Sequence, residues 1–349
     1  MLRLVALLAA IAAAGCGRPH DLGVTSSSSS SSGAGGATSS TGSGGAGGAT
    51  SSSSSGSGGA VVDAGPSGPT ELTIVNGIND YPAVRLCFLP GDTPWPAATS
   101  GLAFAGSEVV ALPASAIPAD SDVTPWVIAG DLAQTGGKTC AQILALAATD
   151  AGAPSVLAQP LAVIPKQIWD SKKSLLMVPH GCVGSHDDPN ATLACGAGYT
   201  PSTPTAGMTL VAMSRQEDPG HVSLQVVSAS PAFPEIDVKL LPNLTDATPV
   251  LMVSALTQGA IGPAPPFAAM TLAELGPLDG VQIQTYNPGT TSLSSAEALS
   301  DVFAHGGVGQ AAVVNGARLV LVAVGSGPGL PAGGFWHKLT YAIVAADPG

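Results

Sequence analysis

The residues best suited to chemistry lie in one short segment, residues 180–190. It holds two imidazoles and two adjacent carboxylates, from His180, His186, Asp187 and Asp188. Such groups can ligate a divalent cation or act as general acids and bases. Adjacent aspartates need not point at one ion, however, and the spaced carboxylates of a calcium loop are missing. We therefore favour a solvated loop with no metal, and a metal-dependent or hydrolytic enzyme is the alternative.

Cysteines border the same segment and suggest what stiffens it. Besides Cys16, the chain has four cysteines, at Cys87, Cys140, Cys182 and Cys195. An even number in an exported protein predicts two disulfides, although four cysteines allow three connectivities. The simplest pairing is Cys87–Cys140 with Cys182–Cys195. A zinc site that combines His180 and His186 with the last two cysteines is the rival hypothesis, but it lacks the closely paired cysteines of structural zinc motifs.

Signatures of other catalytic sites are missing from the sequence. It contains no G-x-S-x-G nucleophile elbow, no H-E-x-x-H and no P-loop. The glycine-rich run at 325–329 includes Pro328, which favours a turn over a phosphate cradle. The tryptophans can form a carbohydrate platform or pack in a core, and the core is favoured; they are Trp95, Trp126, Trp169 and Trp336. We expect a protein that is not an enzyme and uses no cofactor.

Charge and composition exclude nucleic acid as a partner and favour strands. The 11 basic and 23 acidic residues give a net charge of −12, whereas a phosphate backbone requires clustered Lys and Arg. Forty-five glycines and 30 prolines disfavour long helices and are typical of short strands separated by turns.

The N-terminus has the pattern of an export signal. A basic start at Arg3 precedes an apolar run from Leu4 to Ala14 that is too short to span a bilayer, and small residues lead to Cys16. This end resembles the bacterial lipobox, in which the peptide is cut before a cysteine that is then lipidated. The resemblance implies that residues 1–15 are a lipoprotein signal peptide and that Cys16 anchors the chain to a membrane. An incidental cysteine or an uncleaved anchor is the alternative.

Residues 16–69 are predicted to be a disordered linker behind that lipidated cysteine. From Thr25 to Ala60 every residue is Ser, Gly, Ala or Thr, so no apolar surface can be buried to offset the entropy of ordering. A flexible chain of this kind spans roughly 40 Å, which holds a folded head away from the lipid surface.

The rest of the chain contains an internal repeat. Segment 72–90 aligns without gaps on segment 224–242, with identities such as Leu72 with Leu224 and Pro82 with Pro234. Self-similarity of this kind indicates a duplicated unit. Later expected strands at 174–178 and 209–213 match those at 318–322 and 339–343. We predict a first module at 70–220, which carries the disulfides, and a second at 221–349.

The second module carries a family resemblance. Residues 228–239 read S-A-S-P-A-F-P-E-I-D-V-K, and they resemble the opening of a secreted bacterial family of tandem β-sandwich modules, a domain of unknown function. The strand L-V-L-V-A-V-G at 319–325 is similar to a later strand of that family. The resemblance implies an extracellular setting and no assigned catalytic residues. The first module departs from the pattern at Asn76–Asp80 and at Arg85, which replaces the aspartate.

The alternation of apolar and polar residues predicts an all-β fold. We expect two tandem antiparallel β-sandwich modules with one or two short helices each. Helices are predicted at 138–148 and 294–303, the second with a capping box from Ser294 to Glu297. The Pro/Gly-rich inserts at 91–123 and 257–293 are expected to be loops.

Together these features predict a lipid-anchored protein of the bacterial cell envelope, exported to the outer membrane or cell surface. It would display its two modules for binding or structure, and its partners would be the membrane and an envelope protein or glycan. A carbohydrate- or solute-binding lipoprotein is a further alternative, although a solute binder normally alternates strands and helices, which this sequence does not.

Overall fold

The computed structural model describes residues 71–112, 114–149, 155–171, 173–184, 186, 188, 190–244, 247–265, 267–327, 330 and 336–346. These residues all belong to one compact unit. The signal peptide, Cys16 and the linker of the sequence-based prediction lie outside them. No helix in the described part of the chain is long and apolar enough to cross a membrane.

The first half of the described chain forms two sheets. The first inner sheet has the order β5-β1-β8-β9, with β2 continuing the pairing of β1 along β8. Its strands are β1 (Glu71–Val75), β2 (Gly77–Ile78), β5 (Ser107–Ala111), β8 (Ser174–Gly181) and β9 (Gly207–Met213). The first outer sheet has the order β4-β3-β6-β7, built from β3 (Ala83–Leu89), β4 (Leu102–Ala103), β6 (Thr124–Gly130) and β7 (Val156–Pro160).

The second half repeats this plan. The second inner sheet has the order β13-β10-β17-β18, and β14 also pairs with β10. Its strands are β10 (Val222–Ser228), β13 (Ile261–Gly262), β14 (Ala268–Met270), β17 (Arg318–Val324) and β18 (Thr340–Ala345). The second outer sheet has the order β12-β11-β15-β16, built from β11 (Glu235–Leu241), β12 (Val250–Thr257), β15 (Gln282–Tyr286) and β16 (Leu293–Ala298).

The predicted all-β fold with two groups of sheets is therefore confirmed. One feature of the pairing differs from a fully antiparallel sandwich, because β1 runs parallel to β8 and β10 runs parallel to β17. The same parallel pair thus occurs once in each half. The module boundary at 220/221 stays a prediction; the chain passes from β9 to β10 in this region.

Short helices interrupt both halves. They are α1 (Cys140–Thr149), α2 (Lys166–Trp169), α3 (Ala191–Cys195), α4 (Leu272–Leu275) and α5 (Leu299–His305), with 3-10 turns η1 (Leu132–Thr135), η2 (Leu278–Gly280) and η3 (Gln310–Ala312). The helix predicted at 138–148 is present as α1. The helix predicted at 294–303 is wrong in its first half, which is strand β16. The inserts expected to be loops also contain strands, among them β5 and β14.

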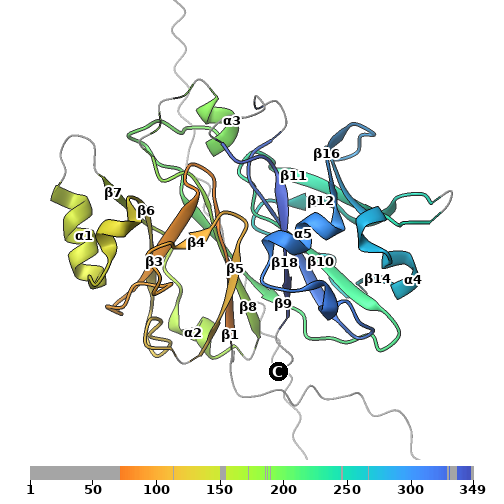
Figure 1. Cartoon of the computed structure of the whole chain (residues 1–349), viewed down its shortest axis with the longest axis horizontal. Helices are drawn as coiled ribbons and strands as arrows, with labels where there is room; N and C mark the ends of the chain where they lie inside the picture. The colour runs from red at the N-terminus through yellow and green to blue at the C-terminus, as the bar shows by residue number, and fades with distance from the viewer. Residues whose placement is uncertain are drawn as a thin grey trace, which may run out of the picture. The chain divides into compact units, whose positions relative to one another are not determined.

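The two inner sheets pack against each other, so the described chain is a stack of four β layers (Figure 1). Alternate residues of β8 serve two different cores. Leu175 and Met177 face the first outer sheet, while Leu176 and Val178 face the second half. Likewise, Leu321 of β17 faces the second outer sheet, and its neighbours in the strand face the first half. Strands buried on both faces become near-continuous apolar runs, which explains the low charge of these segments.

Candidate functional site

The loops that follow the parallel strands gather at one end of the stack, which we call the loop end. These loops follow β2, β8, β10 and β17, and short helix α3 lies among them, at the top of Figure 1. In open α/β sheets, ligands bind beyond the carboxyl ends of the parallel strands, and the loop end has the corresponding position in this all-β fold. The loop end also contains the histidine-rich segment singled out in the sequence, so the candidate site is built here.

A buried polar contact joins the two halves at the loop end. The Asn79 side-chain amide donates to the carbonyl of Ala194, at 2.7 Å, and to the hydroxyl of Ser326. Asn79 and Ser326 are both fully buried. Asn79 belongs to the first half and Ser326 to the second, while Ala194 lies in α3. This contact therefore holds the loop closed by the Cys182–Cys195 disulfide, which we call the disulfide loop, against the second half.

Aromatic rings form a cluster at the loop end, and two of them, Tyr199 and Trp336, pack with Ala194 of α3. The ring of His186 lies 5.1 Å from that of Tyr81 and 6.1 Å from that of Trp336, centroid to centroid. Tyr199 lies edge-on to Trp336 at 6.4 Å, and its hydroxyl donates to the carbonyl of His186 at 3.1 Å. Burial lowers the pKa of His186. Its imidazole therefore serves as a neutral ring in an aromatic cluster.

Asp80 is the most perturbed acid in the cluster. Its carboxylate accepts the backbone N–H groups of Val183, at 3.0 Å, and Gly184, at 2.8 Å, and it is fully buried. Burial raises the pKa of Asp80 from 3.8 to about 6, and the hydrogen bonds from Gly184 and Val183 oppose that rise. The carboxylate holds the start of the disulfide loop in place, and both of its oxygens are occupied.

Acidification should favour the wild-type protein over the Asp80→Asn variant. A folded-state pKa of about 6 means that the folded chain binds this proton more tightly than the unfolded chain does. The contribution of Asp80 to stability is therefore full below pH 4 and is lost as the pH rises through 6. The stability difference, wild type minus variant, should grow by roughly 2–3 kcal/mol between pH 7 and pH 4.

The measurement is urea unfolding of both proteins at each pH. Subtracting the variant from the wild type cancels the pH dependence of groups that both proteins contain. One such group is His180, whose pKa is lowered by burial to about 4. Its contribution to stability falls on acidification, opposite to that of Asp80. A difference that stays constant with pH, or shrinks on acidification, would contradict the assigned burial of the Asp80 carboxyl.

The structure does not bring the predicted chemical residues into one centre. His180 lies on β8, where a Cβ added to Gly207 would lie 3.0 Å from its ring. His186 packs among aromatic rings instead. The pKa of Asp188 is lowered by hydrogen bonds from the Asn190 backbone and the Trp336 indole, while Asp187 lies outside the described residues. In the described part of the chain, no three His, Cys, Asp or Glu side chains converge as a metal site would require.

The cysteines form the simplest of the three predicted connectivities. Cys87 of β3 is bonded to Cys140 of α1, and Cys182 is bonded to Cys195 at the end of α3. The zinc hypothesis is wrong in its ligand set, because two of its four ligands bond each other. Two buried disulfides indicate an oxidising, extracytoplasmic compartment.

The tryptophans do not form a common platform. Trp95 and Trp169 are both buried in the core of the first half, Trp336 is buried in a separate cluster with Tyr199, and the partly buried Trp126 packs in a third cluster, with α1. Packing in the core, the favoured interpretation, explains all four.

A second histidine site was missed in the sequence. Glu297 accepts the hydroxyl of Thr340 at 2.7 Å and the backbone N–H of Tyr341 at 3.1 Å, and His305 Nδ1 lies 3.5 Å from its carboxylate. In a catalytic triad, the imidazole is hydrogen-bonded to the nucleophilic hydroxyl on one side and to the carboxylate on the other. Here the hydroxyl donates directly to Glu297, so the group clamps β16 to β18. No sequence signal joins these three residues, which are brought together by the packing of α5.

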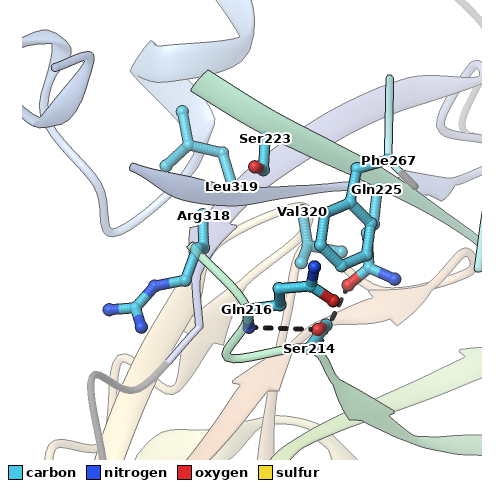
Figure 2. Close-up of a pocket in the computed structure, with 8 residues that line it drawn as sticks. All are labelled: Ser214, Gln216, Ser223, Gln225, Phe267, Arg318, Leu319 and Val320. Atoms are coloured by element: carbon cyan, nitrogen blue, oxygen red, sulfur yellow. Dashed lines mark hydrogen bonds between the residues drawn. The ribbon is translucent and has the colours of Figure 1, made fainter. Parts of the chain in front are cut away.

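The pocket in Figure 2 lies where the segment between β9 and β10, which connects the two halves, passes β10 and β17 of the second inner sheet. Its cavity volume is about 10 Å³, room for about one water molecule and far below the range of small-molecule sites, roughly 300–1,000 Å³. Gln225 accepts the backbone N–H of Ser214 at 3.1 Å and donates to the carbonyl of Pro263 at 3.2 Å. Arg318 pairs with Glu217 at 3.3 Å. These contacts hold the segment between β9 and β10 on the second inner sheet.

In the sequence, Asn79 and Asp80, at the centre of the loop end, were noted only because the first module departs there from the pattern of the second. They fall in the segment where the first module lacks the Ala-Ser-Pro triplet of the second. Comparison with protein-family models and with curated proteins found no match to the chain. The family resemblance of residues 228–239 and 319–325 therefore stays a prediction.

Proposed function

We propose that this protein is a lipid-anchored component of the bacterial cell envelope that displays two joined β modules and works by binding, not by catalysis. The observation that carries the proposal is the pair of buried disulfides inside an all-β head, preceded in the sequence by an export-signal pattern over residues 1–15 and then by Cys16. A lipidated cysteine followed by a long Ser/Gly linker would hold such a head at the outer membrane or cell surface.

The contacts of the titratable groups at the loop end support binding over catalysis. Asp80 is fully buried, and both of its oxygens accept backbone N–H groups. His186 is held among aromatic rings. A general acid or base must reach a proton of its substrate, and neither group is presented in that way.

Replacing the proposed anchor should release the protein from membranes. In a bacterial host fed radiolabelled palmitate, the wild-type chain is expected to carry the label and to sediment with the membrane fraction. Cys16→Ser should lose the label and, once the signal segment is removed, appear in the soluble extracytoplasmic fraction, because the acyl chains that anchor the wild-type protein are missing. Protease added to intact cells should degrade the wild-type head if it is displayed at the surface.

Cys182→Ser is the matched control, since it also removes one thiol but leaves the signal intact, and it should still be labelled. A Cys16→Ser protein that kept the palmitate label would refute Cys16 as the lipidated residue. A wild-type protein without label would refute lipidation itself.

A further inference from the structure

The two inner sheets have the same strand pairings. In the first half, β8 lies parallel to β1 and antiparallel to β9; in the second half, β17 lies parallel to β10 and antiparallel to β18. At the other edge, β5 pairs antiparallel with β1, as β13 and β14 do with β10. Each of these strands in one sheet therefore has an equivalent strand in the other.

The core that the inner sheets share is built from equivalent residues. Strand pairing and the sequence repeat match its apolar residues in the following way: Val75 with Val227, Leu176 with Val320, Val178 with Val322, Val211 with Val344, and Met213 with Ala346. The first half thus presents nearly the same apolar surface to the second half as the second half presents to the first.

Contacts at the margins of the shared core have the same symmetry. β5 of the first half contacts β18 of the second, and β13 of the second half contacts β9 of the first. Because β5 is equivalent to β13 and β9 to β18, each contact repeats the other with the halves exchanged. The parallel strands of both halves run toward the loop end (Figure 1), so an approximate two-fold axis lies along the strands. Such an interface is typical of a symmetric dimer, but here it lies within one chain.

The covalent connection between the halves contributes little to this interface. Residues 214–221 join β9 to β10 at the end of the stack opposite the loop end. Much of this segment is exposed, including Glu217, Pro219 and Gly220, and both disulfides lie within the first half. The halves are therefore held together by noncovalent contacts, as two subunits would be.

The symmetry breaks near the loop end, where core-facing positions differ between the halves. The first half has Gly77, His180 and Thr209, and the second half has Ala229, Val324 and Ala342 at the equivalent positions. A Cβ added to Gly77 would lie 2.9 Å from a methyl carbon of Val324, which is closer than carbon atoms pack. Two second halves would bring the Cβ of Ala229 to this position, so they fit together less well than the native pair.

Two first halves would also pair poorly. The Nδ1 of His180 and the Oγ1 of Thr209 are buried with no hydrogen-bond partner among the described residues. Burying a polar atom without a partner is destabilising. The native pairing buries each of these atoms once, whereas two first halves would bury each of them twice. Each half therefore fits the opposite half better than it fits another copy of itself.

We propose that each inner sheet is a pairing surface specific for the opposite half, and that it accepts that half from a second copy of the chain as well as from its own. Two copies would then form a dimer by exchange of halves, which would link them without any new interface. Exchange needs neither the lipid anchor nor a ligand, so it can succeed or fail independently of the proposed function.

The test is complementation between two full-length chains with defects in opposite halves. Val178→Asp places an unpaired carboxylate in the shared core from the first half, and Val322→Asp does so from the second. Each chain also carries Cys16→Ser, which removes the proposed lipidation site, and only one carries an affinity tag. Neither variant is expected to fold alone. When both are produced in the same cells, the tagged chain should retain the other at a 1:1 ratio, and the pair should sediment as a dimer and unfold in one cooperative transition.

The control pair combines Val322→Asp with Val344→Asp, whose defects both lie in the second half. Its only intact halves are first halves, so it should give no folded dimer. The proposal is overturned if the Val178→Asp and Val322→Asp chains give no folded dimer. It is also overturned if the control pair gives one, because like halves would then pair.

A second measurement avoids destabilised variants. A protease site is inserted between Glu217 and Asp218 of the otherwise unchanged chain, and the folded protein is cut there. The two fragments should sediment together at the size of the uncut protein and separate only when urea unfolds them. Fragments that separate without denaturant would refute the pairing surface, since the halves would then depend on their covalent connection.

Discussion

Val322→Asp should abolish cooperative folding of both halves together. Val322 is fully buried in the core between the two inner sheets, on a strand paired on both sides. The new carboxylate would have neither water nor a cation, and an uncompensated buried charge costs about 3–5 kcal/mol or more. Domains of this kind have only about 5–15 kcal/mol of stability. The measurement is urea unfolding followed by tryptophan fluorescence, which reports on Trp95, Trp126 and Trp169 in the first half and on Trp336 in the second.

The control is Val314→Asp, the same substitution at a side chain that is 52 % exposed, which should cost less than about 0.5 kcal/mol. If the halves were independent sandwiches, the face of β17 that carries Val322 would meet solvent. Val322→Asp would then behave like the control. A variant that unfolds only the second half, with the first half intact, would also contradict the shared core.

The strands of each half were predictable, but the packing of the halves was not. Alternation and the repeat at 72–90 and 224–242 identify the first strands of both copies, and the later matches at 174–178 and 318–322 are β8 and β17. After their first residues, Ser174 and Arg318, these two segments are apolar at every position. Such runs are typical of strands buried on both faces. The sequence does not indicate which surface covers the second face of β8 and of β17. That surface belongs to the other half of the protein, far away in the chain.

The error at 294–303 shows the limit of local propensity. Ser294 and Glu297 have the spacing of a capping box, but Glu297 lies in β16 and accepts hydrogen bonds from β18. A real capping box occurs at the start of α4, where Thr271 is the N-cap and Glu274 lies in the first turn. Both segments carry the same signal, and only the long-range contact of Glu297 distinguishes them. Tertiary contacts of that kind override weak intrinsic preferences.

The candidate site was predictable in its location and not in its chemistry. Sequence spacing directed attention to residues 180–190, and the structure places His186 and Asp188 at the loop end beside Trp336. The buried acid of that region is Asp80, about a hundred residues earlier in the chain. Its role depends on two backbone N–H groups, which no side-chain pattern can encode.

Removing the Cys87–Cys140 disulfide should destabilise the protein more than removing Cys182–Cys195. The first pair spans 53 residues and the second spans 13. In the chain-entropy model, these loops correspond to about 4 and about 3 kcal/mol of stabilisation. The double variants Cys87→Ala/Cys140→Ala and Cys182→Ala/Cys195→Ala should follow this order in urea unfolding without reductant, and each serves as the control for the other.

Hydrogen exchange distinguishes the effect of each disulfide on the entropy of the unfolded chain from its effect on local contacts in the folded protein. Apart from the bonded Cys140, Ile143 is the only fully buried side chain among residues 140–148 of α1, so the disulfide supplies much of what holds this helix on the first outer sheet. The amides of α1 should therefore lose protection in the Cys87→Ala/Cys140→Ala variant and keep it in the other. The loop end should respond in the opposite way, because Cys182–Cys195 encloses α3 and the backbone groups bonded to Asp80. If Cys182→Ala/Cys195→Ala proved the more destabilised variant, native contacts at the loop end would outweigh loop length, and the junction between the halves would be the main source of stability.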